Sequence, residues 1–243
     1  MTQNSHSKIE KSIFLLLVLT ILVTSVGACV QILPLFIRDV SIEQVEGMRP
    51  YTPLELAGFN IYKREGCYNC HSQQIRPLRD EFERYGHYSL AAESMYDYPF
   101  QWGSKRTGPD LARLGEKYSD QWHVEHLINP RNLVSVSVMP GYPHLIRKAL
   151  DYSEVKAEMK ILKMLGVPYS DDDIENAEFD LLLQAGIEDD YEGRMRFSEV
   201  YNSPAIRIFD GNSSQVSEMD AIIAYLQSLG RKVDLETNLG RNW

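Results

Sequence analysis

The sequence predicts a mainly α-helical protein, in which one N-terminal transmembrane helix precedes a helical domain with long loops. Three observations predict this: an uncharged apolar run near the N-terminus, helix-capping patterns at both ends of the remaining chain, and no strand alternation between them. With 44% hydrophobic residues and a mean hydropathy of -0.31, the chain is too apolar for a disordered protein but has too few apolar residues for several membrane spans. Its net charge of -9 argues against nucleic acid as a partner, because phosphate contacts need an excess of Lys and Arg.

The apolar run covers residues 13–37, none of which carries a formal charge. At about 1.5 Å rise per residue, a helix of this length crosses the roughly 30 Å hydrocarbon core of a membrane. A cleaved signal peptide has a shorter apolar region. Val26 to Cys29 resembles a lipoprotein cleavage box, but lipidation at Cys29 would leave residues 30–37 as an apolar stub without purpose. A buried helix of a soluble core, the third alternative, rarely runs this long without a charge.

The charges that flank the run predict its orientation. Lys8 and Lys11 precede it, whereas Arg38 on the other side is offset by Asp39, so the positive-inside rule places the N-terminus in the cytoplasm. The rest of the chain then lies outside the cytoplasm, in a periplasm-like space. The expected parts are a cytoplasmic N-terminus (1–12), a membrane anchor (13–37), a linker (38–51), a folded domain (52–230) with an acidic insertion at about 171–217, and a tail (231–243).

Two helices are expected to bracket the folded domain. Residues 52–55 (T-P-L-E) form a capping-box pattern that starts a helix running into Cys67. Near the other end, Ser217 can cap a helix that Gly230 closes. Between them, residues 72–150 are dense in Tyr, Trp, Gly and Pro, which favours loops over a sheet.

Cys67, Cys70 and His71 form a C-x-x-C-H motif, the sequence signal for covalent attachment of haem c. Two thiols one turn apart can each add to a haem vinyl group, and the adjoining histidine is then held under the iron. A redox dithiol would need a βαβ context and a zinc site a second ligand pair, and the sequence has neither. We therefore expect one haem c, with thioethers from both cysteines and His71 as the proximal axial ligand.

The second axial ligand must come from a distant segment, and a thioether raises the iron potential into the range of electron carriers. Met139 lies in S-V-M-P-G-Y, where Pro140 and Gly141 prevent a regular helix and can turn the sulfur inward. Met95, in a tyrosine-rich loop, is the main rival. We expect Met139 to be the distal ligand. The other candidates are expected to be core methionines (Met159, Met164, Met219) or structural and surface histidines (His87, His123, His126, His144).

Charge is concentrated between residues 171 and 199, where eleven acidic side chains face only Arg194 and Arg196. This excess equals the net charge of the whole chain, -9. One interpretation is a solvated face, in which the first three aspartates favour the positive end of a helix. The other is a docking surface for a basic partner. The apolar side of the expected helix holds Ile174, Ala177, Leu181 and Leu182.

The motif, its neighbours and residues 107–111 (T-G-P-D-L) resemble class I cytochromes c. The resemblance implies a class I cytochrome c-like haem domain, in which the carbonyl of Pro109 accepts the other N–H of the proximal histidine. It also implies that the terminal helices cross closely, with Gly58 and Tyr62 on the first and Tyr225 on the last.

Longer stretches resemble the monohaem subunit II of cbb(3)-type cytochrome c oxidases. They are the span ending in I-L-P-L-F, the motif E-G-C-Y-N-C-H-S-Q-Q-I-R-P, residues 83–115, and N-P-R-N-L-V-S-V-S-V-M-P-G-Y-P-H-L. The resemblance covers residues 13–169 and resumes at Glu218; the segment from Asp180 to Ser217 looks longer and more acidic than in the family.

This family implies a terminal oxidase in which the subunit passes electrons from a dihaem cytochrome c subunit to the catalytic haem-copper subunit, where oxygen is reduced and protons are pumped. Residues 88–106 would pack on the catalytic subunit, with Trp102, Ser104, Lys105 and Arg106 as contact candidates. Two other classes stay open: a stand-alone membrane-tethered electron shuttle, and a haem-based sensor or assembly factor with five-coordinate iron.

Overall fold

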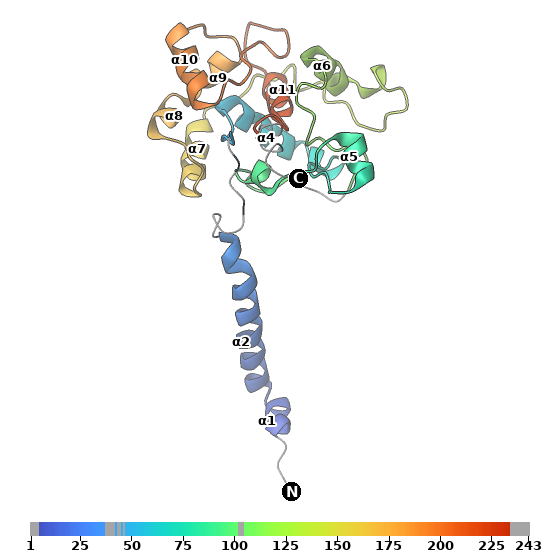
Figure 1. Ribbon diagram of the computed structural model, residues 1–243, viewed down its shortest axis with the longest axis vertical. Coiled ribbons are helices and arrows are strands. Elements are labelled where there is room, and N and C mark those ends of the chain that lie inside the picture. Colours follow the sequence, from blue (N-terminus) through green and yellow to red (C-terminus); the bar gives the residue numbers. More distant parts are fainter. Residues whose placement is uncertain (1–4, 37–41, 43–44, 46, 102–104, 234–243) are drawn as a thin grey trace. The chain divides into compact units, whose positions relative to one another are not determined.

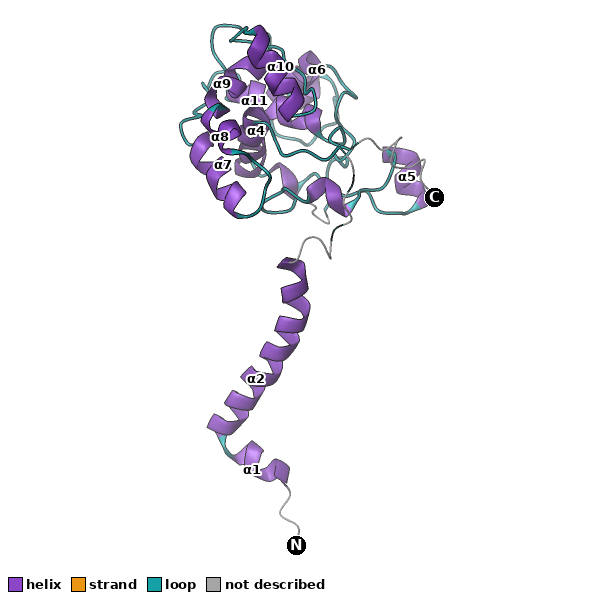
Figure 2. Cartoon of the chain, turned by 60° about the vertical axis from the view of Figure 1, so that its left-hand side comes forward, coloured by secondary structure: helices purple, strands orange, loops and turns teal. Residues whose placement is uncertain are grey.

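The protein folds into helices joined by long loops, as the computed structural model in Figure 1 shows. Within the part of the chain that the structure describes, no β-strand forms, and an isolated antiparallel bridge joins Ala149 to Ser217 (Figure 2). The predicted mainly α-helical fold is confirmed. The chain divides into two units, residues 1–44 and 45–243. The described residues are 5–36, 42, 45, 47–101 and 105–233.

The first unit consists of helices α1 (Ser5–Lys11) and α2 (Ile13–Ile32) and a 3-10 turn, η1 (Leu33–Phe36). The hydroxyl of Ser12 caps α2 by accepting a hydrogen bond from the amide of Leu15 at 3.4 Å. At 1.5 Å per residue α2 is about 30 Å long, and it alone among the described helices is long and apolar enough to cross a membrane. Helix α2 begins at Ile13, the first residue of the predicted anchor. Ile37, half of the predicted linker and residues 234–243 lie outside the described residues.

Helices α4 (Pro53–Arg64) and α11 (Glu218–Ser228) pack against each other in the second unit. Both begin with a capping box. The Thr52 hydroxyl accepts from the Glu55 amide at 3.2 Å, and the Glu55 carboxylate accepts from the Thr52 amide at 3.1 Å. Ser217 and Asp220 exchange the same pair of bonds at the start of α11. Both bracketing helices are thus confirmed, because their start signals are local in sequence.

A cluster of aromatic rings fills the contact between these helices. The ring of Tyr225 lies 5.3 Å from Tyr62, 5.5 Å from Phe59 and 5.7 Å from Tyr51, measured between ring centroids. All four side chains are buried. The Tyr225 hydroxyl accepts a hydrogen bond from Gln73 Nε2 at 2.8 Å, which joins this core to the segment that follows the C-x-x-C-H motif.

The middle of the chain is rich in loops but also contains helices that the sequence did not reveal. The absence of strands predicted for residues 72–150 is confirmed in their described part. Helix α6 (Asp120–Ile128) is short, so its apolar pattern is limited to Val124, Leu127 and Ile128. Its start is fixed by Ser119, whose hydroxyl accepts from the Trp122 amide at 3.2 Å. The elements here are η2 (Cys67–Asn69), α5 (Arg79–Tyr85), η3 (Ala91–Ser94), α6 (Asp120–Ile128) and η4 (Pro130–Asn132).

The acidic segment folds into three helices. Ser170 caps α8, and the chain breaks at Asn176 before α9, so two short helices form where one was expected. The predicted apolar side is buried at Ile174, Ala177 and Leu181, and half-buried at Leu182. The helices are α8 (Asp171–Glu175), α9 (Ala177–Gln184) and α10 (Tyr191–Val200), beside α7 (Val155–Met164).

The three methionines assigned to the core differ in their surroundings. Met159 and Met219 are 0% exposed, which confirms their assignment. The assignment of Met164 is wrong, because its side chain is 86% exposed. Met164 follows Met159 by five residues, which places it about 140° further around the helix axis and away from the core.

Candidate haem site

The C-x-x-C-H motif follows directly on α4. Gly66, at φ +71°, turns the chain out of the helix, since left-handed backbone favours glycine. The amides of Cys70 and His71 both donate to the carbonyl of Cys67, at 3.1 and 3.0 Å, so the motif closes into a single turn. Neither Cys67 nor Cys70 is in a disulfide. Burial, with the Glu65 carboxylate as a further cause, raises the pKa of the Cys67 thiol to about 12.

The imidazole of His71 is held by the loop at residues 107–111. Its Nδ1 lies 2.8 Å from the carbonyl oxygen of Pro109, which sets Nδ1 as the donor and leaves Nε2 for a metal. A Cβ on Gly108 would lie 2.3 Å from Cε1 of His71, so only glycine allows the ring to lie this close. The Gly108 amide also donates to the carbonyl of Cys70 at 2.9 Å. Burial lowers the pKa of His71, which favours the neutral imidazole.

Asp110, next to Pro109, fastens this loop to the segment after the motif. Its carboxylate accepts hydrogen bonds from the Ser72 hydroxyl at 2.5 Å and from the Gln74 amide at 2.9 Å. Its other oxygen accepts from the Ala112 amide at 2.8 Å. The Asp110 side chain is fully covered. These bonds fasten the loop at residues 107–111 to the segment that follows His71. The residues that they join are far apart in sequence, so no short motif reveals them.

Arg106 completes this network. Its guanidinium donates to the Ser72 hydroxyl at 2.7 Å and to Glu81 at 2.8 Å. Hydrogen bonds from Arg106 and then Arg76 lower the pKa of Glu81 to about 2, so this carboxylate stays charged. Of the residues expected to contact the catalytic subunit, Arg106 is thus bound inward and Lys105 is exposed, while Trp102 and Ser104 lie outside the described residues.

The loop that carries Met139 lies beside the motif. Met139 is partly buried against the hydrophobic core. The amide of Tyr142 donates to the carbonyl of Leu127 at 2.6 Å, which fixes the loop to the end of α6. His144, on the same loop, places its Nε2 3.4 Å from the Glu65 carboxylate, just before the motif, and burial raises the pKa of the Tyr142 hydroxyl.

The residues around the motif fit a haem. Val136 and Val138, on the Met139 loop, are 85% and 75% exposed, and such apolar surface is expected to be covered by an apolar group. Among the described residues, no three His, Cys, Asp or Glu side chains gather as ligands for a metal ion. One imidazole, one thioether and a nearby pair of thiols are the donor set of a c-type haem.

Of the rival ligands, His126 is half-buried on α6. Burial, with His71 as a lesser cause, lowers its pKa. Its Nδ1 is buried without a hydrogen-bond partner. His126 stacks on Trp122 with ring centroids 4.5 Å apart, and Trp122 on Tyr118 at 4.0 Å. In the sequence, the four-residue spacing of Tyr118, Trp122 and His126 is the pattern that could have predicted this stack of rings.

The remaining rivals have other surroundings. His123 is 2% exposed, and burial lowers its pKa to about 4. The Nε2 of His144 lies 3.4 Å from Glu65, and the His87 ring lies tilted against that of Tyr88, with centroids 4.1 Å apart. Met95 is half-buried at the end of η3.

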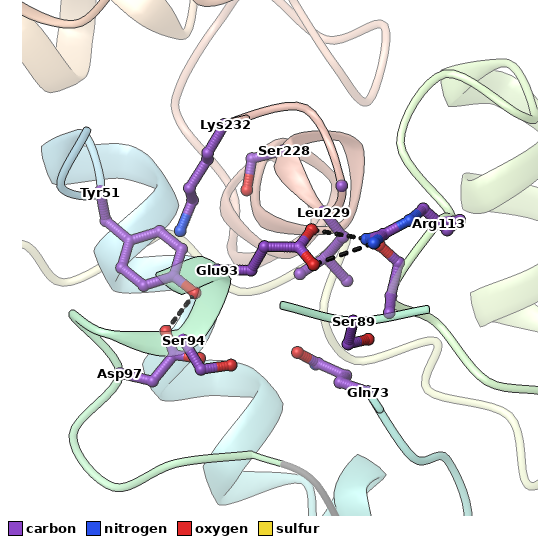
Figure 3. Close-up of a pocket in the computed structure, with 12 residues that line it drawn as sticks. Tyr51, Gln73, Ser89, Glu93, Ser94, Asp97, Arg113, Ser228, Leu229 and Lys232 are labelled. Atoms are coloured by element: carbon purple, nitrogen blue, oxygen red, sulfur yellow. Dashed lines mark hydrogen bonds and ion pairs between the residues drawn. The ribbon is translucent and has the colours of Figure 1, made fainter. Parts of the chain in front are cut away.

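A second polar cluster, which the sequence did not reveal, lies beyond the end of α11 (Figure 3). The Lys232 ammonium lies 2.9 Å from the ring centroid of Tyr51, and burial lowers its pKa to about 7. The Tyr51 hydroxyl donates to Asp97 at 2.6 Å, and Arg113 donates to both carboxylate oxygens of Glu93, at 2.6 and 2.9 Å. The charged side chains of the cluster thus interact with one another or with Tyr51, and the cluster packs against the aromatic core.

The fold and this donor set define a membrane-anchored helical protein of the cytochrome c class. Residues 6–233 match the family described as cytochrome c oxidase, mono-heme subunit/FixO. Because the match spans nearly the whole chain, the protein belongs to this family and is a subunit of a cytochrome c oxidase complex with one haem. Comparison with curated proteins gave no match. The predicted resemblance to the monohaem subunit is confirmed.

Proposed function

We propose that this chain carries its haem covalently, through thioethers from Cys67 and Cys70, with His71 as the proximal iron ligand and Met139 as the distal one. The observation that carries the proposal is the 2.8 Å contact between His71 Nδ1 and the Pro109 carbonyl. It orients the ring, fixes the tautomer that coordinates through Nε2, and increases the basicity of the ligand.

The haem supplies a one-electron redox couple, and the residues of this chain set its properties. Met139 would supply a thioether ligand, which would raise the iron potential and leave no open position for oxygen. The buried bonds of Asp110 to Ser72 and Gln74 hold the proximal side rigid, so little reorganisation accompanies electron transfer. This subunit therefore relays electrons and leaves oxygen reduction to the catalytic haem-copper subunit.

The electron donor that we propose is a dihaem cytochrome c subunit, and the acceptor is the catalytic subunit. The membership in an oxidase subunit family supports the acceptor. Lys8 and Lys11, ahead of the apolar helix, support a periplasmic haem domain. Attachment of haem to thiols in an exported compartment is consistent with this orientation.

Denaturing electrophoresis of the natively purified complex, stained for haem, tests the attachment. The parent chain is expected to keep its haem, a Cys67→Ala, Cys70→Ala variant to lose it, and a Cys29→Ala control to keep it. Mass spectrometry of the copurifying chains tests the partners. Haem released from the parent by denaturation contradicts covalent attachment, and purification without other oxidase subunits contradicts the relay and favours the stand-alone shuttle.

A further inference from the structure

Helix α7 has an exposed face that carries large apolar side chains. Ala157, Lys160, Ile161 and Met164 are all exposed, and their spacing of i, i+3, i+4 and i+7 places them on one side of the helix. Ile161 is 58% and Met164 86% exposed. The opposite side is buried in the core through Val155, Met159 and Leu162, so α7 is apolar on two faces.

Three lysines lie on or beside this face, and the exposed acidic side chain of Glu154 lies one turn before Ala157. Lys163 pairs with Asp171 at 2.7 Å, and Lys156 with Glu178 at 3.4 Å. These pairs neutralise two of the acids nearest to α7. No hydrogen bond or ion pair engages Lys160 among the described residues, so its ammonium is available to an anionic group.

This face lies near the point where the chain enters the folded domain. The backbone carbonyl of Tyr51 accepts a hydrogen bond from the Tyr169 hydroxyl at 2.8 Å, and the Tyr51 hydroxyl donates to Asp97 at 2.6 Å. The next residue, Tyr98, donates through its hydroxyl to the carbonyl of Leu165, at the C-terminal end of α7, at 3.2 Å. The end of α7 and the entry of the chain therefore belong to one region of the domain.

The sequence ties that region closely to the membrane anchor. The chain runs from Phe36, where η1 ends, to Tyr51 in 15 residues. At about 3.5 Å per residue, this segment can span at most about 50 Å. A surface tethered at this range meets the bilayer at a high effective concentration, so a small contact is enough to hold it there.

We propose that the exposed face of α7 docks on the bilayer surface. Ile161 and Met164 enter the interfacial region beside the acyl chains, and Lys160 lies at the level of the lipid phosphates. The contact would fix the orientation of the haem domain above the membrane, which a flexible linker alone could not do. The proposal goes beyond electron relay and does not depend on which residues bind the iron.

Site-directed spin labelling of the full chain, within the complex and in phosphatidylglycerol-containing nanodiscs, tests the proposal. In a Cys29→Ser background, a nitroxide is attached at Met164→Cys, at Ile161→Cys, or at the matched control Met195→Cys. Met195, on α10, is 58% exposed, which matches the exposure of Ile161. Collision of the label with oxygen, which concentrates in lipid, is compared with collision with a water-soluble nickel chelate, using oxidised protein with an unchanged haem spectrum.

The oxygen-to-nickel collision ratio is expected to be several-fold higher at positions 161 and 164 than at 195. Equal ratios at all three positions, with strong nickel collision, would mean that the face is in water and would overturn the proposal. Weak collision with both reagents at 161 and 164 would also overturn it, because the face would then be covered by another protein subunit.

Discussion

Gly58 on α4 lies directly against the backbone of Ala221 on α11. A Cβ at position 58 would stand 1.9 Å from the carbonyl oxygen of Ala221 and 2.7 Å from the Cβ of Tyr225. The close crossing of the terminal helices, expected from the resemblance to class I cytochromes c, is thereby confirmed. Because α4 leads straight into the C-x-x-C-H motif, this crossing also positions the haem site.

Gly58→Ala should therefore destabilise the haem domain. The added methyl has no space, and forcing the helices apart should cost about 3 kcal/mol or more of unfolding free energy. Chemical denaturation followed by haem absorbance measures the change. Gly27→Ala is the control, since a Cβ there meets nothing within 4 Å. An unchanged unfolding midpoint for Gly58→Ala would be incompatible with the close crossing.

Asp110→Asn should affect both the stability and the iron potential. Asn has one acceptor oxygen, so it cannot accept from Ser72 and Gln74 on one side and from the Ala112 amide on the other, and loss of hydrogen bonds to a charged group costs about 2 kcal/mol. The Pro109 carbonyl then loses its fixed position against His71. Redox titration should give an altered midpoint potential. Asp80→Asn, at an exposed position on α5, should change neither quantity, and identical behaviour of the two variants would contradict a positioning role for Asp110.

The buried Lys232 should make stability depend on pH. Its pKa is lowered by burial from 10.5 in the unfolded chain to about 7 in the folded protein. Between these pH values the unfolded chain binds more protons, so the free energy of unfolding rises with pH across this window. The groups that face Lys232 are Asp97, Glu55, Arg49 and Glu93.

Lys232→Met removes this titration. Relative to the variant, the parent should gain stability from pH 7 to pH 10, and the two should run parallel below pH 6. Denaturation at a series of pH values measures the difference. A constant difference over the whole range would show that the Lys232 pKa is not lowered by folding.

The acidic segment at residues 171–199 is either a solvated face or a docking surface for a basic partner. The structure shows which of its acidic residues can be changed to test this. Glu188, Asp189 and Glu192 are exposed and can be changed to amides, whereas Asp190 should be kept because it caps α10 through the Gly193 amide at 2.6 Å. If the segment steers a basic partner, the triple variant should associate more slowly, and the salt dependence should flatten. Unchanged kinetics at low ionic strength would leave only the solvated face.

The parts of the fold that the sequence predicts are those with local signals. The capping boxes at Thr52 and Ser217 fix the two terminal helices, and the C-x-x-C-H turn needs only consecutive residues. The roles of Asp110 and Lys232 could not be predicted, because their partners come from distant segments. The core assignment of Met164 was wrong because an apolar residue on a helix was assumed to face the core, whereas its position five residues after Met159 turns it outward.

The central proposal, a haem c ligated by His71 and Met139, is tested most directly by the absorption spectrum of the oxidised Met139→Leu variant. The variant should keep its covalent haem but lose the sulfur-to-iron band at the red end of the spectrum, while Met95→Leu and His126→Leu keep it. If the band persists in Met139→Leu, the sulfur comes from another methionine and the assignment of the distal ligand is wrong.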